Sequence, residues 1–215
     1  MTQNTAPTLR SHLREARKQI TDADHQRGSL LIRARLFTWL AVARDQAIRA
    51  QTPVPKIVAV FWPLADEPDL TPLIEKWLHD EDLPAIEVVL PVVVADDAPL
   101  AFYPYNSLTV LKPDQFGVMA PEPIDGQTSR IPDVVLVPTL GFTQQGDRIG
   151  YGKGFYDRTL CKLRQQNPKM VAIGIAWNEG NIEAFEPSYQ PAPHDFRLNY
   201  VLTPTDWWPA KPTNA

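Results

Sequence analysis

The stretch from Gly146 to Arg158 carries the residue types best suited to chemistry, and it reads G-D-R-I-G-Y-G-K-G-F-Y-D-R. Glycines alternate at positions 150, 152 and 154, and a residue without a Cβ atom lets an anion approach the backbone N–H groups closely. A helix that begins at Phe155 would add its own free N–H groups and a positive dipole end. Arg148 and Lys153 add full positive charges. The stretch therefore predicts a phosphate-binding loop.

Two common phosphate motifs do not fit this loop. A P-loop of the Walker A type needs a glycine five residues before Gly152 and a Ser or Thr after Lys153, where this chain has Asp147 and Gly154. A dinucleotide-binding fingerprint that starts at Gly150 needs a third glycine where Phe155 stands. Spacing alone leaves a phosphate loop of another type.

A group of acidic residues follows the apolar run Lys56–Trp62. This run is typical of a strand buried on both faces. Asp66, Glu67 and Asp69 lie directly after it, at the edge of a sheet where open α/β proteins bind ligands. Acids at this place bind a metal, hold an amine or cap the next helix. For Asp69 we expect the capping role.

Two helices are predicted ahead of that strand. Residues 8–20 place Leu9 and Leu13 on one face, beside a basic stripe of Arg10, Arg14 and Arg17. The stripe is either a solvated face or an arm for a polyphosphate. Thr21 suits the N-cap of a helix that runs to about Ala50. Its expected core residues are Leu30, Leu31, Ala34, Phe37, Trp39, Leu40 and Ala41.

The remaining pattern alternates strands with helices. Further strands are predicted at Glu87–Val94, Asp133–Pro138, Lys169–Trp177 and Asn199–Thr203, and helices at 70–80 and 155–166. Residues 99–123 suggest one short strand and an irregular excursion. This order predicts an α/β fold, a three-layer domain with a mostly parallel sheet covered by helices on both faces. We expect one domain over residues 1–215, with a frayed tail over 209–215.

Composition narrows the function classes. The net charge of −4 argues against a nucleic-acid binder, and no apolar run approaches the ~20 residues that span a bilayer. The chain has one cysteine, Cys161, which excludes an internal disulfide and suits a reducing cytoplasm. We expect Cys161 to be a small buried residue of helix 155–166. A monomer in the cytoplasm, without nucleic-acid or membrane partners, is the expectation.

The segment V-P-T-L-G-F-T-Q-Q-G-D-R-I-G-Y-G-K-G-F-Y-D-R-T-L (137–160) resembles the signature of 5-formyltetrahydrofolate cyclo-ligases, also called methenyltetrahydrofolate synthetases. The family pattern reads roughly P-G-L-A-F-D-x-x-G-x-R-L-G-x-G-x-G-Y-Y-D-x-x-L. The opening helix at 9–21, the run I-V-A-V-F-W-P-L-A-D-E-P-D and H-D-F-R-L-N-Y-V-L-T follow in the family's order. The resemblance therefore covers essentially the whole chain.

This resemblance implies an ATP- and Mg²⁺-dependent enzyme with 5-formyltetrahydrofolate as its small-molecule substrate. In the family, the γ-phosphate of ATP passes to the formyl oxygen, and the neighbouring nitrogen then closes the ring as phosphate leaves. The products are 5,10-methenyltetrahydrofolate, ADP and phosphate. Phosphoryl transfer depends on positioning and charge neutralisation more than on protein nucleophiles, which suits this sequence.

The resemblance also assigns residues. Lys153 and Arg148 take the catalytic role, and Asp157 and Asp195 match aspartates associated with magnesium. The residues implied for the nucleotide are Arg10, Arg14, Arg148, Ile149, Gly150, Tyr151, Gly152, Lys153, Gly154, Phe155 and Tyr156. Those implied for the folate are Trp62, Glu67, Tyr151 and Phe155. For Asp157 the alternative is a helix N-terminal charge that pairs with Arg158 or Lys162.

Two positions depart from the family pattern. In the register that aligns Ile20 and Thr21, Ala6 stands where the family has a basic residue; a shifted register makes Arg10 and Arg14 the basic pair instead, but then Ile20 and Thr21 no longer align. Asn199 stands where the family has a second aspartate after the Asp195 position. The alternative to an active enzyme is therefore a non-catalytic relative that binds folate or nucleotide as a sensor or storage protein.

Overall fold

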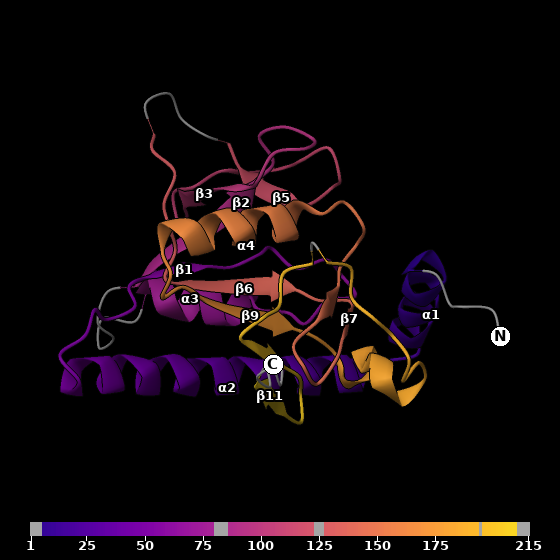
Figure 1. Cartoon of the computed structure of the whole chain (residues 1–215). Coiled ribbons are helices and arrows are strands. Elements are labelled where there is room, and N and C mark those ends of the chain that lie inside the picture. The colour runs from indigo at the N-terminus through magenta and orange to yellow at the C-terminus, as the bar shows by residue number, and fades with distance from the viewer. Residues whose placement is uncertain (1–5, 80–85, 123–126, 194, 210–215) are drawn as a thin grey trace.

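Figure 1 shows the computed structural model of the chain, which describes residues 6–79, 86–122, 127–193 and 195–209. Its α-helices are α1 (Ala6–Lys18), α2 (Asp22–Arg49), α3 (Thr71–His79) and α4 (Phe155–Gln166). The strands are β1 (Ile57–Ala59), β2 (Glu87–Val92), β3 (Ala101–Pro104), β4 (Leu111–Pro113), β5 (Met119–Pro121), β6 (Val134–Pro138), β7 (Gly141–Phe142), β8 (Arg148–Ile149), β9 (Val171–Ile175), β10 (Tyr200–Leu202) and β11 (Trp207–Pro209). Short 3₁₀ helices span Asn178–Gly180 and Ile182–Ala184.

The main sheet has the strand order β11-β10-β9-β6-β1-β2-β3. The five inner strands pair in parallel, whereas β11 and β3 pair antiparallel at the two edges. Continuous apolar runs such as Val134–Val137 form the inner strands, and these four residues are all buried. Strands of this kind need cover on both faces. The mostly parallel α/β sheet predicted from the sequence is confirmed.

Alternate residues of each strand supply the two core clusters on the two faces of the sheet. Val58 packs with residues of α2 and α3, such as Leu36 and Ile74. Its neighbour Ala59 packs on the opposite face with Leu160 and Leu163 of α4. The arrangement is therefore the predicted three layers, with α2 and α3 on one face and α4 on the other (Figure 1).

Helix α2 is capped as predicted, and its expected core is right in part: Leu40 is buried, and Phe37 and Trp39 are partly buried against the same core cluster. The Thr21 side chain accepts from the Asp24 N–H, as an N-cap does. However, Leu30 is 58% exposed and Leu31 is 40% exposed, and Ala34 and Ala41 are exposed as well. The buried residues are Gly28, Ser29, Ile32, Leu36, Leu40 and Arg44. This long helix carries apolar residues around most of its circumference, so apolar content identified only part of the buried side.

Two other local expectations need correction. The segment 99–123 forms three short strands, β3, β4 and β5, where one was expected. Cys161 is exposed on α4 and is not a core residue. Residues 210–215 of the tail for which fraying was expected lie outside the described residues.

The strand order creates a switch point beside β1. From β1 the chain moves to β2 on one side, and from β6 it moves to β9 on the other. The connections therefore leave the carboxyl ends of β1 and β6 in opposite directions, which opens a crevice between them. Strand β1 ends earlier than predicted, at Ala59, and the still-buried Val60 and Phe61 lead the chain into that crevice.

Candidate active site

A cavity of about 1380 Å³ lies at the carboxyl ends of β1 and β6. Of the residues that the sequence proposed for the site, only Arg14 does not line it; Arg14 is exposed on α1. The predicted residues that line the cavity are Arg10, Trp62, Glu67, Arg148, Ile149, Gly150, Tyr151, Gly152, Lys153, Gly154, Phe155, Tyr156, Asp157 and Asp195. The fold thus brings together segments that are far apart in the sequence.

The glycine loop connects strand β8 to helix α4. Strands β7 and β8 form an antiparallel hairpin after β6, and α4 begins at Phe155 as predicted. Gly152 has φ +96° and Gly154, the N-cap of α4, has φ +69°. Residues with a Cβ atom rarely adopt this left-handed conformation, so both positions favour glycine.

At each of the three glycines, a guanidinium group lies so close that an added Cβ atom would press against it. A Cβ atom on Gly150 would overlap the Arg148 side chain, and one on Gly154 would lie 2.7 Å from Arg158 Nη1. A Cβ atom on Gly152 would lie 3.2 to 3.3 Å from the guanidinium of Arg10. The sequence predicted that the glycines admit a ligand to the backbone; in the structure they also admit arginines, which turns the loop into a cluster of cations.

The family resemblance assigns Arg10 to the nucleotide, and Arg10 Nε donates to the Gly150 carbonyl at 3.0 Å. On that assignment, substitution of Gly152 by alanine is expected to weaken nucleotide binding through Arg10. The matched control is Gly117→Ala, because Gly117 also has a left-handed φ of +77° but open space around it. Both variants should lose about 1 kcal/mol of stability from backbone strain. Only Gly152→Ala should raise the KM for ATP, several-fold; equal KM values in the two variants would contradict the contact with Arg10.

Arg148 is the most enclosed cation of the site. Its side chain is 5% exposed, and its Nη2 donates to Asp157 Oδ1 at 2.9 Å. The guanidinium carbon lies 5.8 Å from the centre of the Tyr156 ring, and Nε is buried without a hydrogen-bond partner. Asp157 therefore pairs with Arg148, and not with Arg158 or Lys162 as the alternative reading had it.

Glu67 lies deep in the same cavity, with 4% of its surface exposed. Tyr151 Oη donates to Glu67 Oε1, and the Leu64 N–H donates to Oε2 at 2.9 Å. Burial raises the pKa of the Glu67 carboxyl above its ordinary value. Burial and the neighbouring Glu67 charge likewise raise the pKa of the Tyr151 phenol.

Helix α2 holds the acidic loop in place. The Asp69 N–H donates to Ser29 Oγ at 3.0 Å, and the His25 ring contacts the Glu67 carbonyl oxygen at 2.9 Å. The Asp69 carboxylate accepts from the Thr71 N–H at 2.9 Å, so its predicted capping of the next helix is confirmed. These contacts hold the backbone of Glu67 and Asp69 against α2.

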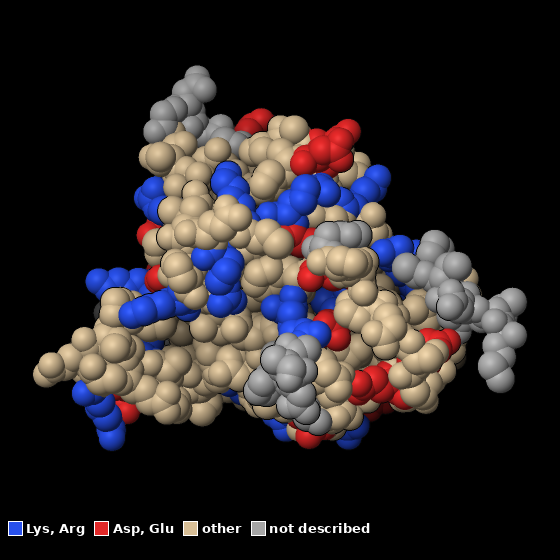
Figure 2. All heavy atoms as spheres, viewed as in Figure 1, with Lys and Arg blue, Asp and Glu red and all other residues tan. Residues whose placement is uncertain are grey.

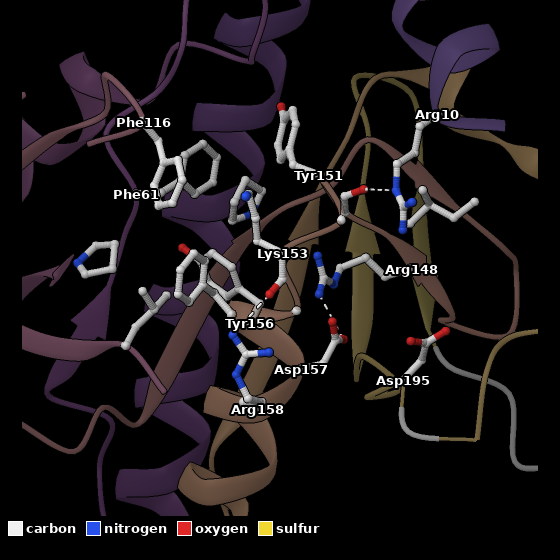
Figure 3. Close-up of a pocket in the computed structure, with 18 of the residues that line it drawn as sticks. Arg10, Phe61, Phe116, Arg148, Tyr151, Lys153, Tyr156, Asp157, Arg158 and Asp195 are labelled. Atoms are coloured by element: carbon white, nitrogen blue, oxygen red, sulfur yellow. Dashed lines mark hydrogen bonds and ion pairs between the residues drawn. The ribbon is translucent and has the colours of Figure 1, made fainter. Parts of the chain in front are cut away.

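The cavity has two chemically different ends (Figure 3). Arg10, Arg148, Asp157 and Asp195 lie together at the charged end. Phe61 and Phe116 lie at the other, apolar end, where the Phe155 ring centre is 5.7 Å from that of Phe116. Lys153 lies between the two ends, with its Nζ 5.4 Å from the centre of the Phe116 ring.

One wall of the charged end was missed from the sequence. Glu186, Ser188, Tyr189, Gln190 and Ala192 line the cavity in a segment that reads as a proline-rich loop. Burial and the nearby Asp195 and Asp147 carboxylates raise the pKa of Tyr189 to about 12. The prolines at 187, 191 and 193 indicate a stiff loop, but nothing in the segment indicates that the loop lies against the cavity.

The carboxylates fit a magnesium ion only in part. Asp157 and Asp195 line the charged end, and Asp195 Oδ2 also accepts from the Ala192 N–H at 2.9 Å. Within the described ranges, which omit His194, no group of three or more His, Cys, Asp or Glu side chains could hold a metal. Magnesium usually binds one or two carboxylates together with substrate phosphates, so this donor set suits a nucleotide-bound ion. Asn199 instead has a structural role, because its Oδ1 accepts from Arg164 and from the Ala172 N–H.

The surface around the site carries charges of both signs. Figure 2 shows lysine and arginine side chains over and around α4, with acidic side chains close to them. In the part of the chain that the structure describes, no helix is long and apolar enough to cross a membrane.

The sequence of this chain is similar to those of known proteins over most of its length. A relative from Mycolicibacterium smegmatis, a 5-formyltetrahydrofolate cyclo-ligase, is 31% identical over 69% of this chain and 74% of its own. The Escherichia coli cyclo-ligase is 29% identical over 91% of this chain and 98% of its own. The solved 5,10-methenyltetrahydrofolate synthetase of Aquifex aeolicus has the same fold, with a TM-score of 0.71 and 24% identity over 98% of this chain and 95% of that one.

A second solved structure, a 5,10-methenyltetrahydrofolate synthetase from Mycoplasma pneumoniae, has a TM-score of 0.66 and 20% identity over 93% of this chain and 98% of that one. At these low sequence identities, the two solved structures support the fold and nothing further. The sequence profile of the 5-formyltetrahydrofolate cyclo-ligase family matches residues 2–204, which include the glycine loop, Glu67 and Asp195. On that match, the chain belongs to the 5-formyltetrahydrofolate cyclo-ligase family.

Proposed function

We propose that the chain converts 5-formyltetrahydrofolate to 5,10-methenyltetrahydrofolate, with ATP as the phosphoryl donor and ADP and phosphate as the other products. The main observation in support is that three arginines (Arg10, Arg148 and Arg158) and the buried Glu67 carboxylate line one cavity that also has an apolar wall. Pockets for single small ligands usually span ~300–1,000 Å³. The volume of about 1380 Å³ suits two substrates side by side.

In this proposal each end of the cavity binds one substrate. Arg10 and Arg148 bind the ATP phosphates, because planar guanidinium groups match phosphate oxygens. The flat folate ring packs against Trp62 and Phe116, and Glu67 accepts a hydrogen bond from a ring N–H. Lys153, between the two ends, lies next to the phosphoryl group that is transferred and stabilises its charge.

The reaction then needs no protein nucleophile. The formyl oxygen attacks the terminal phosphorus of ATP, and the bond to ADP breaks. The neighbouring folate nitrogen attacks the formyl carbon and loses its proton, and the carbon–oxygen bond breaks to release phosphate. Asp157 and Asp195 would hold Mg²⁺, which when bound neutralises charge on the phosphate oxygens.

A spectrophotometric assay tests this function. The purified chain, Mg-ATP and 5-formyltetrahydrofolate are mixed, and the absorbance of the methenyl product is followed. We expect product to form only when ATP, magnesium and the folate are all present. Tight binding of the folate without product would favour the sensor or storage alternative, and ADP formation without folate would point to another acceptor.

A further inference from the structure

Arg17 lies where a surface stripe was expected, yet it is 5% exposed. Its Nη2 donates to the Thr139 carbonyl at 3.0 Å, and its Nη1 donates to Tyr151 Oη at 2.8 Å. Nη1 also lies 3.5 Å from the Asp66 carboxylate. One side chain of α1 therefore joins the end of β6, the acidic loop and the glycine loop.

These contacts fix the direction of a hydrogen-bond chain. A guanidinium group has donors and no acceptor, so Tyr151 Oη must accept from Arg17. The single phenol proton is then free to be donated only to Glu67, whose other oxygen accepts from the Leu64 N–H. Both Glu67 oxygens are thus acceptors, which is the hydrogen bonding of an ionised carboxylate.

We propose that Arg17 is a positioning residue: through Tyr151 it keeps Glu67 an ionised acceptor that faces an N–H donor of the substrate. The role of Glu67 toward the folate rests on the proposed function, whereas the direction of the chain rests on the contacts alone. Without Arg17, Tyr151 Oη is able to accept a hydrogen bond from the O–H of a neutral Glu67, so the direction of the chain can reverse.

The surroundings of Glu67 act on its pKa in two opposite directions. Burial raises the pKa of the Glu67 carboxyl, and the nearby Asp66 charge adds to this effect. Arg17, Tyr151 and the Leu64 N–H oppose it. Burial and the interaction with the Glu67 charge also raise the pKa of the partly buried Tyr156 phenol of α4. Arg17 is the cation among the groups that act on the Glu67 pKa, so its removal should favour the protonated form.

The first test titrates Glu67 in the free protein. Glutamate labelled with ¹³C at the carboxyl carbon is incorporated, and the Glu67 signal is identified as the one missing from Glu67→Gln. Arg17→Met should raise the midpoint pH of the Glu67 titration by about one unit, and Arg17→Lys should raise it by less. The control is Lys18→Met, which removes an exposed cation of the same helix and should leave the midpoint unchanged. An unchanged midpoint in Arg17→Met would overturn the proposal.

The second test asks whether Arg17 acts through Tyr151. In a Tyr151→Phe background the phenol is gone, so Arg17→Met should move the midpoint by less than half of its effect in the wild type. A full shift in both backgrounds would overturn the relay. This comparison also guards against misfolding, because Tyr151→Phe and Arg17→Lys each keep the buried packing.

Turnover separates this inference from the proposed function. If the function holds, Arg17→Met should raise the KM for the folate about tenfold and leave the KM for ATP near the wild-type value. A purely structural role would raise both. The Glu67 midpoint is measured without any substrate, so failure of the methenyl assay and failure of the Arg17 relay are separate results.

Discussion

Replacement of Lys153 by alanine is expected to lower turnover by about 10²–10³-fold, the usual effect of removing one group that stabilises transition-state charge. The side chain is exposed and lies over the Phe116 ring, so it contributes little to the packed core. The unfolding temperature should therefore stay within a degree or two of the wild type. Turnover is measured by formation of the methenyl product, and stability by thermal unfolding.

The matched control for this variant is Lys162→Ala. Lys162 is an exposed lysine of the neighbouring helix α4 that does not line the cavity. It should keep near-normal turnover, so a loss confined to Lys153→Ala reports on position and not on net charge. Turnover within threefold of the wild type in Lys153→Ala would refute the role given to this lysine.

Replacement of Arg148 by methionine is expected to reduce both activity and stability. Turnover should fall by about 10²-fold or more, because the guanidinium proposed to bind the ATP phosphates is lost. The free energy of unfolding should fall by about 3 kcal/mol, because Asp157 is left without its buried partner. Urea unfolding with a shared m-value measures the second effect.

A double variant separates the two effects of Arg148. In Arg148→Met with Asp157→Asn, no unpaired charge remains, so most of the lost stability should return while turnover stays low. If the double variant is no more stable than Arg148→Met alone, the ion pair with Asp157 is not the source of the stability loss. If it regains turnover, Arg148 does not act on the phosphates.

The sequence predicted the elements that have strong local signals. Thr21 was recognised as an N-cap from its own chemistry, and the inner strands from their apolar runs. The glycine loop and the acidic loop were each recognised from residue type, and the sheet topology explains why they meet. Residues of the cavity were thus predictable where the residue type matched the location, as for Glu67 and Arg148.

The parts that escaped prediction depend on distant partners. Arg17 looked like Arg14 in the helical stripe, but its acceptors come from residues 66, 139 and 151, which no local pattern reveals. The buried face of α2 is set by the shape of the sheet beneath it, because Leu31 and Ile32 are equally apolar but only Ile32 is buried. In both cases tertiary packing, and not the local sequence, decides exposure.

The anchoring of α1 has a consequence for synthesis of the chain. Arg10 bonds to a residue 140 positions later, and Arg17 bonds to residues 122 and 134 positions later. At ~5–20 residues per second, roughly 6 to 28 seconds pass on the ribosome before these partners exist. During that time Leu9 and Leu13, which are buried in the finished protein, have no core to join. Helix α1 is therefore expected to need protection by chaperones during synthesis, and the cavity that it helps to line is completed only when residues 139–151 have been made.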